Sequence, residues 1–135
     1  MKELKVKALL DNIPAVTAFI DAELEALDCP LKAQTQIDVA IDELFSNVAR
    51  YAYKTEEGDV EVRFAFDQPT RTASITFIDR GVPFDPLAKE DPDVTLTAEE
   101  RGIGGLGIYL VKKTMDRVEY RREEGYNILT IEKRI

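Results

Sequence analysis

Three polar residues, Glu43, Asn47 and Arg50, follow one another at intervals of four and three positions. On a helix this spacing puts them in one row, each about one turn from the next. A carboxylate can accept a proton, an amide oxygen is a hard ligand for Mg²⁺, and a guanidinium neutralises phosphate charge. The row therefore suits a metal-bound phosphate. The alternative is a solvated polar face, which is the norm for surface helices.

The segment that contains this row has the pattern of an amphipathic helix. Apolar residues recur along one side at three- and four-residue intervals, namely Ile37, Ile41, Leu44, Val48 and Ala52. We therefore predict a helix from about Lys32 to Tyr53, with the polar row on a face next to the apolar one.

A glycine-rich stretch, residues 102–107, runs directly into a second apolar-periodic segment that starts at Ile108. Gly102, Gly104 and Gly107 match the dinucleotide-binding pattern G-x-G-x-x-G, but that pattern should follow a strand, and a polar loop precedes it here. The Gly-Lys-Ser/Thr of a P-loop is absent. Glycines that lead into a helix leave amide N–H groups free at its positive end, which favours a phosphate site. A flexible glycine linker is the alternative.

The tripeptide Asp79-Arg80-Gly81 follows the predicted strand 73–78. A carboxylate at the end of a strand can accept a hydrogen bond from an amine, and a glycine close by leaves room for a flat ring. A simple turn is the alternative, because turns favour Asp and Gly for their own reasons.

The composition excludes several classes of function. A net charge of −8 argues against an electrostatic grip on nucleic acid or an anionic membrane. The absence of histidine excludes a Ser-His-Asp triad, a histidine metal site and a phosphohistidine relay. Cys29 is the only cysteine, so no intrachain disulfide can form. No leader-like N-terminus or bilayer-length apolar run is present, and we expect a soluble cytoplasmic protein.

The order of the expected elements is strand, helix, helix, two strands, loop, helix, two strands. The strands are expected at residues 3–10, 60–67, 73–78, 117–123 and 126–135, and the first helix from Pro14 to about Leu27. This order predicts a single α+β domain, a two-layer sandwich whose mainly antiparallel, mixed sheet is covered on one face by three helices. The inner face of the first helix is expected to hold Ala15, Phe19, Ala22 and Ala26.

Three motifs, taken together, resemble one known superfamily. Glu43-x-x-x-Asn47, Asp79-x-Gly81 and Gly104-Gly105-Leu106-Gly107 resemble, in order and spacing, the N box and the two glycine boxes of the GHKL (Bergerat-fold) ATPases. Residues from about 80 to 104 then correspond to the ATP lid of that superfamily. With 135 residues there is no room for the further domains of gyrases or histidine kinases. The phrases from Asp79 to Pro86 and from Ile103 to Ile108 resemble the small, stand-alone anti-sigma regulatory serine-protein kinases.

The resemblance implies a role for each motif residue. Glu43 would be the general base, and Asn47 would bind Mg²⁺ and, through it, the phosphates. Arg50 would contact phosphate and Tyr51 would pack on the adenine. Asp79 would accept the adenine amino group, beside Gly81. The remaining residues would hold the phosphates and hinge the lid, namely Gly104, Gly105, Leu106 and Gly107.

The resemblance also implies an activity and partners. A kinase of this branch transfers the γ-phosphoryl group of ATP to a serine of a STAS-domain anti-sigma antagonist. It otherwise sequesters a sigma factor, usually as a homodimer. The alternative is an ATP-dependent binding module that switches partners without phosphate transfer.

Three positions depart from the pattern of this branch. Tyr51 replaces a common His, and Ile103 replaces a Gly of the second glycine box. Asn127 stands near the position where a Thr or Ser often helps to bind adenine.

Overall fold

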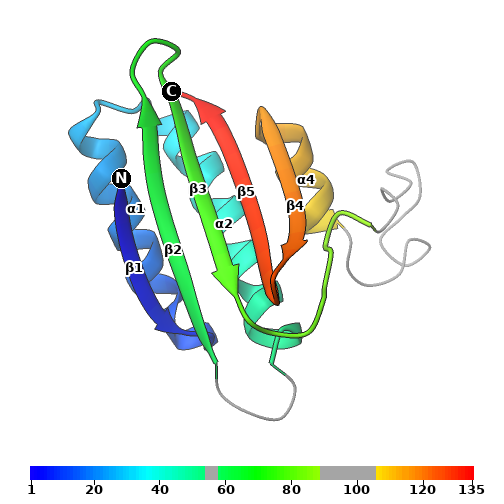
Figure 1. Cartoon of the computed structure of the whole chain (residues 1–135). Helices are drawn as coiled ribbons and strands as arrows, with labels where there is room; N and C mark the ends of the chain where they lie inside the picture. The colour runs from blue at the N-terminus through cyan, green and yellow to red at the C-terminus, as the bar shows by residue number, and fades with distance from the viewer. Residues whose placement is uncertain (54–57, 89–105) are drawn as a thin grey trace.

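Five strands form one sheet in the order β1-β2-β3-β5-β4, and every pairing between neighbours is antiparallel (Figure 1). The computed structural model describes residues 1–53, 58–88 and 106–135. Its strands are β1 (Lys2–Lys7), β2 (Asp59–Asp67), β3 (Thr72–Asp79), β4 (Arg117–Glu123) and β5 (Tyr126–Arg134). Its helices are η1 (Leu10–Asn12, a 3₁₀ turn), α1 (Ile13–Ala26), α2 (Leu31–Tyr51) and α4 (Leu106–Thr114).

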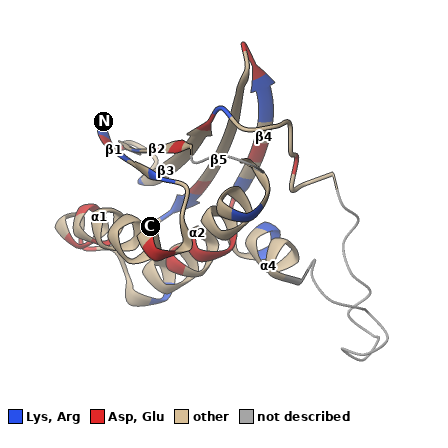
Figure 2. Cartoon of the chain, turned by 90° about the horizontal axis from the view of Figure 1, so that it is seen from below, with Lys and Arg blue, Asp and Glu red and all other residues tan. Residues whose placement is uncertain are grey.

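Helices α1, α2 and α4 all lie on the same side of the sheet (Figure 2). The predicted α+β sandwich with one helix-covered face is therefore confirmed. Helix α2 lies between the other two and packs on both of them. Its apolar side is fully buried, as the periodicity predicts, and contributes Ile37, Ile41, Leu44 and Phe45 to the core. No helix among the described residues is long and apolar enough to span a bilayer.

The strands place two polar residues on the helix-covered face. Alternate residues of β3 and β5 point into the core, among them Phe77 and Leu129. Asp79 and Asn127 continue this inward series and are paired across the β3–β5 ladder. They are the only polar residues classed as buried in the described part of the chain.

The inner face of α1 differs from the prediction. Val16, Ile20 and Leu24 are fully buried, whereas the predicted Ala15, Ala22 and Ala26 are exposed. Of the predicted residues only Phe19 packs against the core, and it is half-buried. The sequence of α1 is apolar on most sides, so the spacing alone does not fix which side turns inward. Because burial of larger apolar area is more favourable, the β-branched residues and the leucine take the inner positions.

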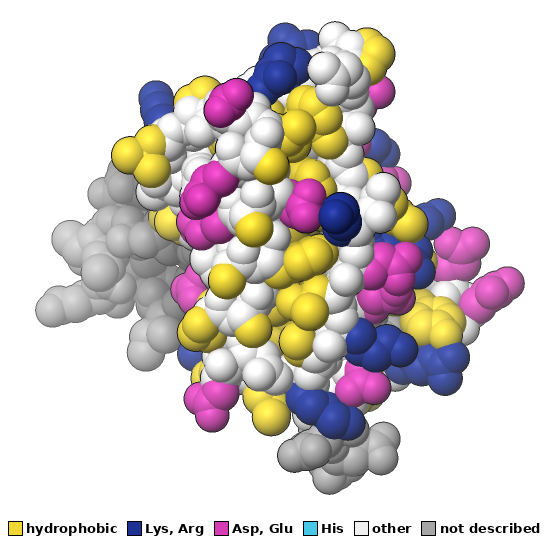
Figure 3. Space-filling model, turned by 90° about the vertical axis from the view of Figure 1, so that its left-hand side faces the viewer, with side chains coloured by type: hydrophobic (Ala, Val, Ile, Leu, Met, Phe, Trp, Pro, Cys, Tyr) yellow, Lys and Arg dark blue, Asp and Glu magenta, His cyan; other side chains and the backbone are white. Residues whose placement is uncertain are grey.

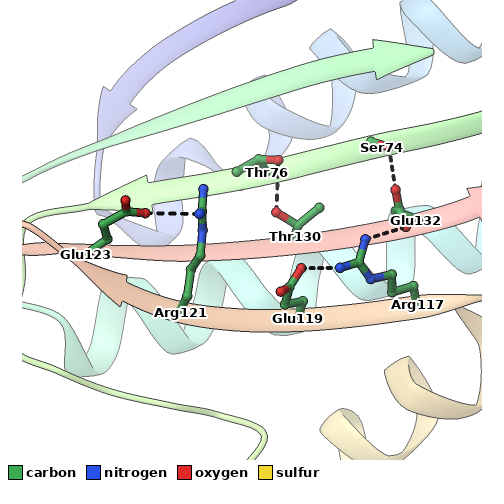
Figure 4. A network of polar contacts seen from close by, with 8 residues as sticks. All are labelled: Ser74, Thr76, Arg117, Glu119, Arg121, Glu123, Thr130 and Glu132. Carbon is green, nitrogen blue, oxygen red and sulfur yellow. Dashed lines mark hydrogen bonds and ion pairs between the residues drawn. The ribbon is translucent and has the colours of Figure 1, made fainter. Parts of the chain in front are cut away.

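No helix of the described residues lies over the other face of the sheet, which carries polar side-chain pairs (Figure 4). Arg117 of β4 forms ion pairs with Glu119 at 2.6 Å and with Glu132 of β5 at 3.3 Å. Thr76 and Thr130 hydrogen-bond across β3 and β5 at 3.2 Å. Such pairs make a solvated face compatible with strand pairing, and charges along the edge strand β4 disfavour edge-to-edge association.

The opposite edge of the sheet is β1, which lies next to α1. Figure 3 shows hydrophobic side chains in a vertical band along this side of the molecule. Leu4 and Val6 of β1 are partly buried against the core. Lys2 of β1 reaches Glu23 of α1 at 4.0 Å, and this exposed pair contributes little to stability.

Candidate functional site

The inner end of the site is the carboxylate of Asp79, the last residue of β3. Its side chain is buried, with 4% of the residue exposed. Oδ1 accepts hydrogen bonds from the Gly81 amide at 2.8 Å and from Asn127 Nδ2 at 2.9 Å. Burial raises the pKa of Asp79, whereas these two donors and the charge of Arg122 act to lower it. Oδ2 accepts no hydrogen bond from the other described residues.

Asn127, which the sequence analysis noted near the adenine position only as a departure from the family pattern, has a buried structural role in this site that sequence reasoning missed. Its Nδ2 donates both to Asp79 and, at 2.8 Å, to the carbonyl of Val82. Its Oδ1 accepts from the hydroxyl of Tyr120 and, at 3.2 Å, from Arg122. The signal that could have found it is the inward phase of a strand, where a polar residue stands among apolar ones.

A narrow cavity lies between α2, the sheet and the segment after β3. Its volume is about 20 Å³, which is room for about one water molecule. The lining is mainly apolar and includes Asn47, Asp79 and Asn127. Phe84 lines the same cavity, and its ring stacks on that of Tyr51 at 5.1 Å between centroids. Tyr51 is thus paired with an aromatic side chain of the protein itself.

The predicted polar row lies on α2 as the spacing requires. Asn47 reaches the cavity, while Glu43, one turn earlier, is half-buried. The Glu43 carboxylate lies directly against Gly107 of α4, where an added methyl group would overlap it. Arg50 is exposed and forms no ion pair with another described residue. The structure therefore brings the first motif and the end of the last motif into contact.

Gly81 has a packing role. A side chain there would overlap the backbone carbonyl of Ala52 at the end of α2, and the next amide, Val82, donates to that carbonyl at 2.8 Å. Glycine therefore lets the segment after β3 lie directly on α2. Leu106 is the first residue of α4. Gly104 and Gly105, together with most of the predicted lid, lie outside the described residues.

The lining of the cavity suits a flat ring with a charged tail, but a volume of about 20 Å³ must widen before a ring can enter. A mainly apolar slot with one buried acceptor at its inner end can recognise a planar heterocycle that has an amino group. The polar row of α2 then lies where a charged tail would leave the slot.

The comparisons with known proteins agree with this geometry. The sequence profile of the family described as "Histidine kinase-like ATPase domain" matches residues 6–133. The chain belongs to this family. It is 30% identical over 131 residues to proteins named "Serine-protein kinase RsbW" from Bacillus cereus (strain AH820) and Bacillus anthracis, covering 94% of this chain and 81% of theirs.

Solved structures show the same fold. One contains the RsbU and RsbW domains of Rv1364c from Mycobacterium tuberculosis, with a TM-score of 0.67, 17% identity and 99% of this chain covered. The match spans 32% of that longer chain. Another is a blue-light activated histidine kinase of Erythrobacter litoralis, with a TM-score of 0.58, 17% identity, 78% of this chain covered and 31% of that chain spanned. The resemblance to the GHKL superfamily is confirmed, and the roles of the individual site residues remain predictions.

Proposed function

We propose that this protein is an ATP-dependent serine-protein kinase of the anti-sigma type. It would transfer the γ-phosphoryl group of ATP to a serine of a STAS-domain anti-sigma antagonist, and would otherwise sequester a sigma factor. The observation that supports this function is the shared cavity. Asp79, a buried acceptor for an amino group, lines it together with Asn47, and Glu43 lies one helical turn away.

The proposed chemistry assigns one task to each residue. Glu43 accepts the proton of the attacking serine hydroxyl while the Oγ–phosphorus bond forms and the bond to the β–γ bridging oxygen breaks. ADP leaves with the electron pair of that bond. Arg50, the last residue of the row, is exposed and would pair with a phosphate oxygen. Such catalysis is mostly positioning and charge neutralisation.

Asn47 fits a magnesium ion through its amide oxygen, because its side chain lines the cavity. No cluster of three or more acidic, cysteine or histidine side chains suits a metal in the described part of the chain. The ion would therefore be held by Asn47 and by the phosphates that enter with it. When bound, Mg²⁺ neutralises phosphate charge.

The chain would act as one GHKL domain with its lid at about residues 80–104, working in the cytoplasm as a homodimer. It would bind neither nucleic acid nor membrane. Sedimentation of the purified chain at micromolar concentration tests the homodimer, since a monomer mass would contradict it.

The test of the activity is phosphate transfer to a purified STAS-domain antagonist in the presence of Mg²⁺ and ATP. Mass spectrometry should find one phosphoserine on the antagonist. Glu43→Gln should abolish it while ATP binding by calorimetry persists. Lys113→Ala, an exposed change on α4, is the matched control and should behave as the wild type.

The second candidate is a binding module that switches with ATP and transfers nothing. The half-buried Glu43 argues against it, because binding alone does not need a base. Saturable ATP binding without any phosphoserine on the antagonist would favour this candidate. Absence of ATP binding at millimolar concentration would contradict both.

A further inference from the structure

The hydrogen bonds around Asn127 form a closed set at the inner end of the cavity. Both protons of Nδ2 are used, one by Asp79 Oδ1 and one by the Val82 carbonyl. Oδ1 in turn accepts from Tyr120 and Arg122. Asn127 is 5% exposed and has no donor left for a ligand. A direct contact with a nucleotide base through Nδ2 would have to break one of these bonds.

The partners of Asn127 come from three different parts of the site. Asp79 ends β3, Val82 begins the segment that lies on α2, and Arg122 belongs to β4. Arg122 also donates to the carbonyl of Gly81 at 2.7 Å. Asn127 therefore fixes the carboxylate and the backbone that follows it as one unit.

We propose that Asn127 is a positioning residue that makes this site selective for adenine over guanine. It holds Oδ1 of Asp79, a residue that lines the cavity, while Oδ2 accepts no hydrogen bond from the other described residues and is the acceptor left for a ligand. An adenine amino group can donate to this oxygen, whereas the carbonyl at the same position of guanine cannot. This inference rests on the proposed nucleotide site and adds to it a residue that selects the base without touching it.

The amide of Asn127 also keeps Asp79 able to accept. A carboxylate in a buried site tends to take up a proton, and a protonated Asp79 could donate to guanine instead. Two N–H donors to Oδ1, from Asn127 and Gly81, favour the charged form. Loss of the Asn127 donor should therefore lower selectivity as well as affinity.

The decisive experiment compares ATP and GTP binding by calorimetry for the wild type and Asn127→Asp. The wild type should prefer ATP by about a hundredfold or more, because a site built to hydrogen-bond one group rejects a base that lacks it. Asn127→Asp keeps the shape but removes the donor, so one of two adjacent carboxyls must take a proton. ATP affinity should fall about tenfold to a hundredfold, and the preference over GTP should fall below about fivefold.

Two further variants should lower the preference for ATP by smaller amounts. Asn127→Thr has one hydroxyl donor where Asn127→Asp has none, so it should recover part of the preference for ATP over GTP. Arg122 is exposed, so the Arg122→Ala variant should fold normally. It should reduce the preference for ATP over GTP about threefold, because Asn127 loses one of its hydrogen bonds. Thr130→Val, on the open face of the same strand, is the matched control and should leave the preference unchanged.

The outcomes separate this inference from the proposed function. If the wild type binds no ATP, the nucleotide site itself is wrong. If the wild type prefers ATP and Asn127→Asp weakens ATP and GTP by the same factor, Asn127 is merely structural and the inference is wrong. Should Asn127→Asp fail to fold, an unchanged preference in both Asn127→Thr and Arg122→Ala would overturn it.

Discussion

The two ends of the candidate site are built differently. At the inner end, a hydrogen bond between Asp79 and Asn127 joins two strands. Each polar side-chain atom of these two residues has a partner, except Oδ2 of Asp79, which has none among the described residues. At the outer end, Glu43 and Arg50 stand on one helix and form no ion pair with another described residue. A pre-organised end can discriminate between ligands, whereas groups without protein partners remain available for charge and protons that arrive with the ligand.

The largest effect is expected from Glu43→Gln at the outer end. Without a base, phosphate transfer should fall about 10²- to 10⁴-fold. ATP affinity should stay within about threefold of the wild type, because the inner end is intact. Single-turnover transfer and calorimetry on the same preparation provide the measurement. Equal losses in both quantities would mean that the two ends do not divide the work as their structures suggest.

Gly107→Ala tests the contact between α4 and the Glu43 carboxylate. The added methyl group would overlap the carboxylate, so we expect a loss of unfolding free energy of about 2 kcal/mol, typical of overpacking. Chemical denaturation measures it. In a Glu43→Ala background the overlap disappears, and the same change should be neutral or stabilising, because alanine is favoured over glycine in a helix by about 0.5–1 kcal/mol.

An unchanged loss in the Glu43→Ala background would contradict this contact. The collision would then involve other groups, and the two motifs would not meet as described.

Phe84→Ala tests whether the aromatic stack closes the inner end. The cavity of about 20 Å³ cannot hold a purine until Phe84 moves away from it. Loss of the stack with Tyr51 should remove about 0.5–1.5 kcal/mol from the cost of opening and tighten ATP binding about 2- to 12-fold. Calorimetry of Phe84→Ala and Tyr51→Ala measures this. Weaker binding by Phe84→Ala would instead mean that Phe84 packs on the bound base.

Asp38→Asn separates the pH dependence of stability from that of binding. Burial and the neighbouring carboxyl of Asp21 on α1 raise the pKa of Asp38 to about 7. In the unfolded chain the pKa of this group is about 3.9. Between about pH 4 and pH 7 the folded protein therefore binds one more proton than the unfolded chain. Wild-type stability should therefore fall as the pH rises through this window.

At pH 8 the Asp38→Asn variant should be more stable than the wild type by about 1 kcal/mol, after allowance for the solvent that reaches this half-buried pair. At pH 4 the two should be nearly equal. Thermal melts at both pH values measure the difference, and Asp42→Asn on the exposed side of α2 is the control. ATP affinity should not change, since Asp38 faces α1 and not the cavity.

Strand β2 and the central helix could be predicted because their patterns are unambiguous, whereas the strand expected at residues 3–10 ends at Lys7 and Leu10 begins a 3₁₀ turn. Val60, Val62 and Phe64 alternate with polar residues in β2, and all three are buried. The helix-facing side of α2 follows its apolar period. In α1 the apolar residues surround the helix, and only contact with α2 and the sheet decides which side is buried. A local pattern cannot contain that information.

The candidate site shows the same limit. Glu43 and Asn47 could be found because their spacing on one helix is local. The bond between Asn127 and Asp79 joins residues 48 positions apart. The stacking of Tyr51 on Phe84 likewise depends on how the segment after β3 lies on α2. The family resemblance suggested that Tyr51 packs on adenine, and no local signal indicated its contact with Phe84.

The pairing of β3 with β5 has a consequence for folding. Since Asp79 and Asn127 are far apart in sequence, their contact forms only after a long loop has closed, which costs entropy and slows folding. The inner end of the site is thus absent from any partly folded chain in which β3 and β5 have not yet paired. A ligand that binds there would select completely folded molecules, and at a hundred times its Kd it would add about 2.7 kcal/mol to their stability. Nucleotide supply would then influence how long the protein survives in the cell.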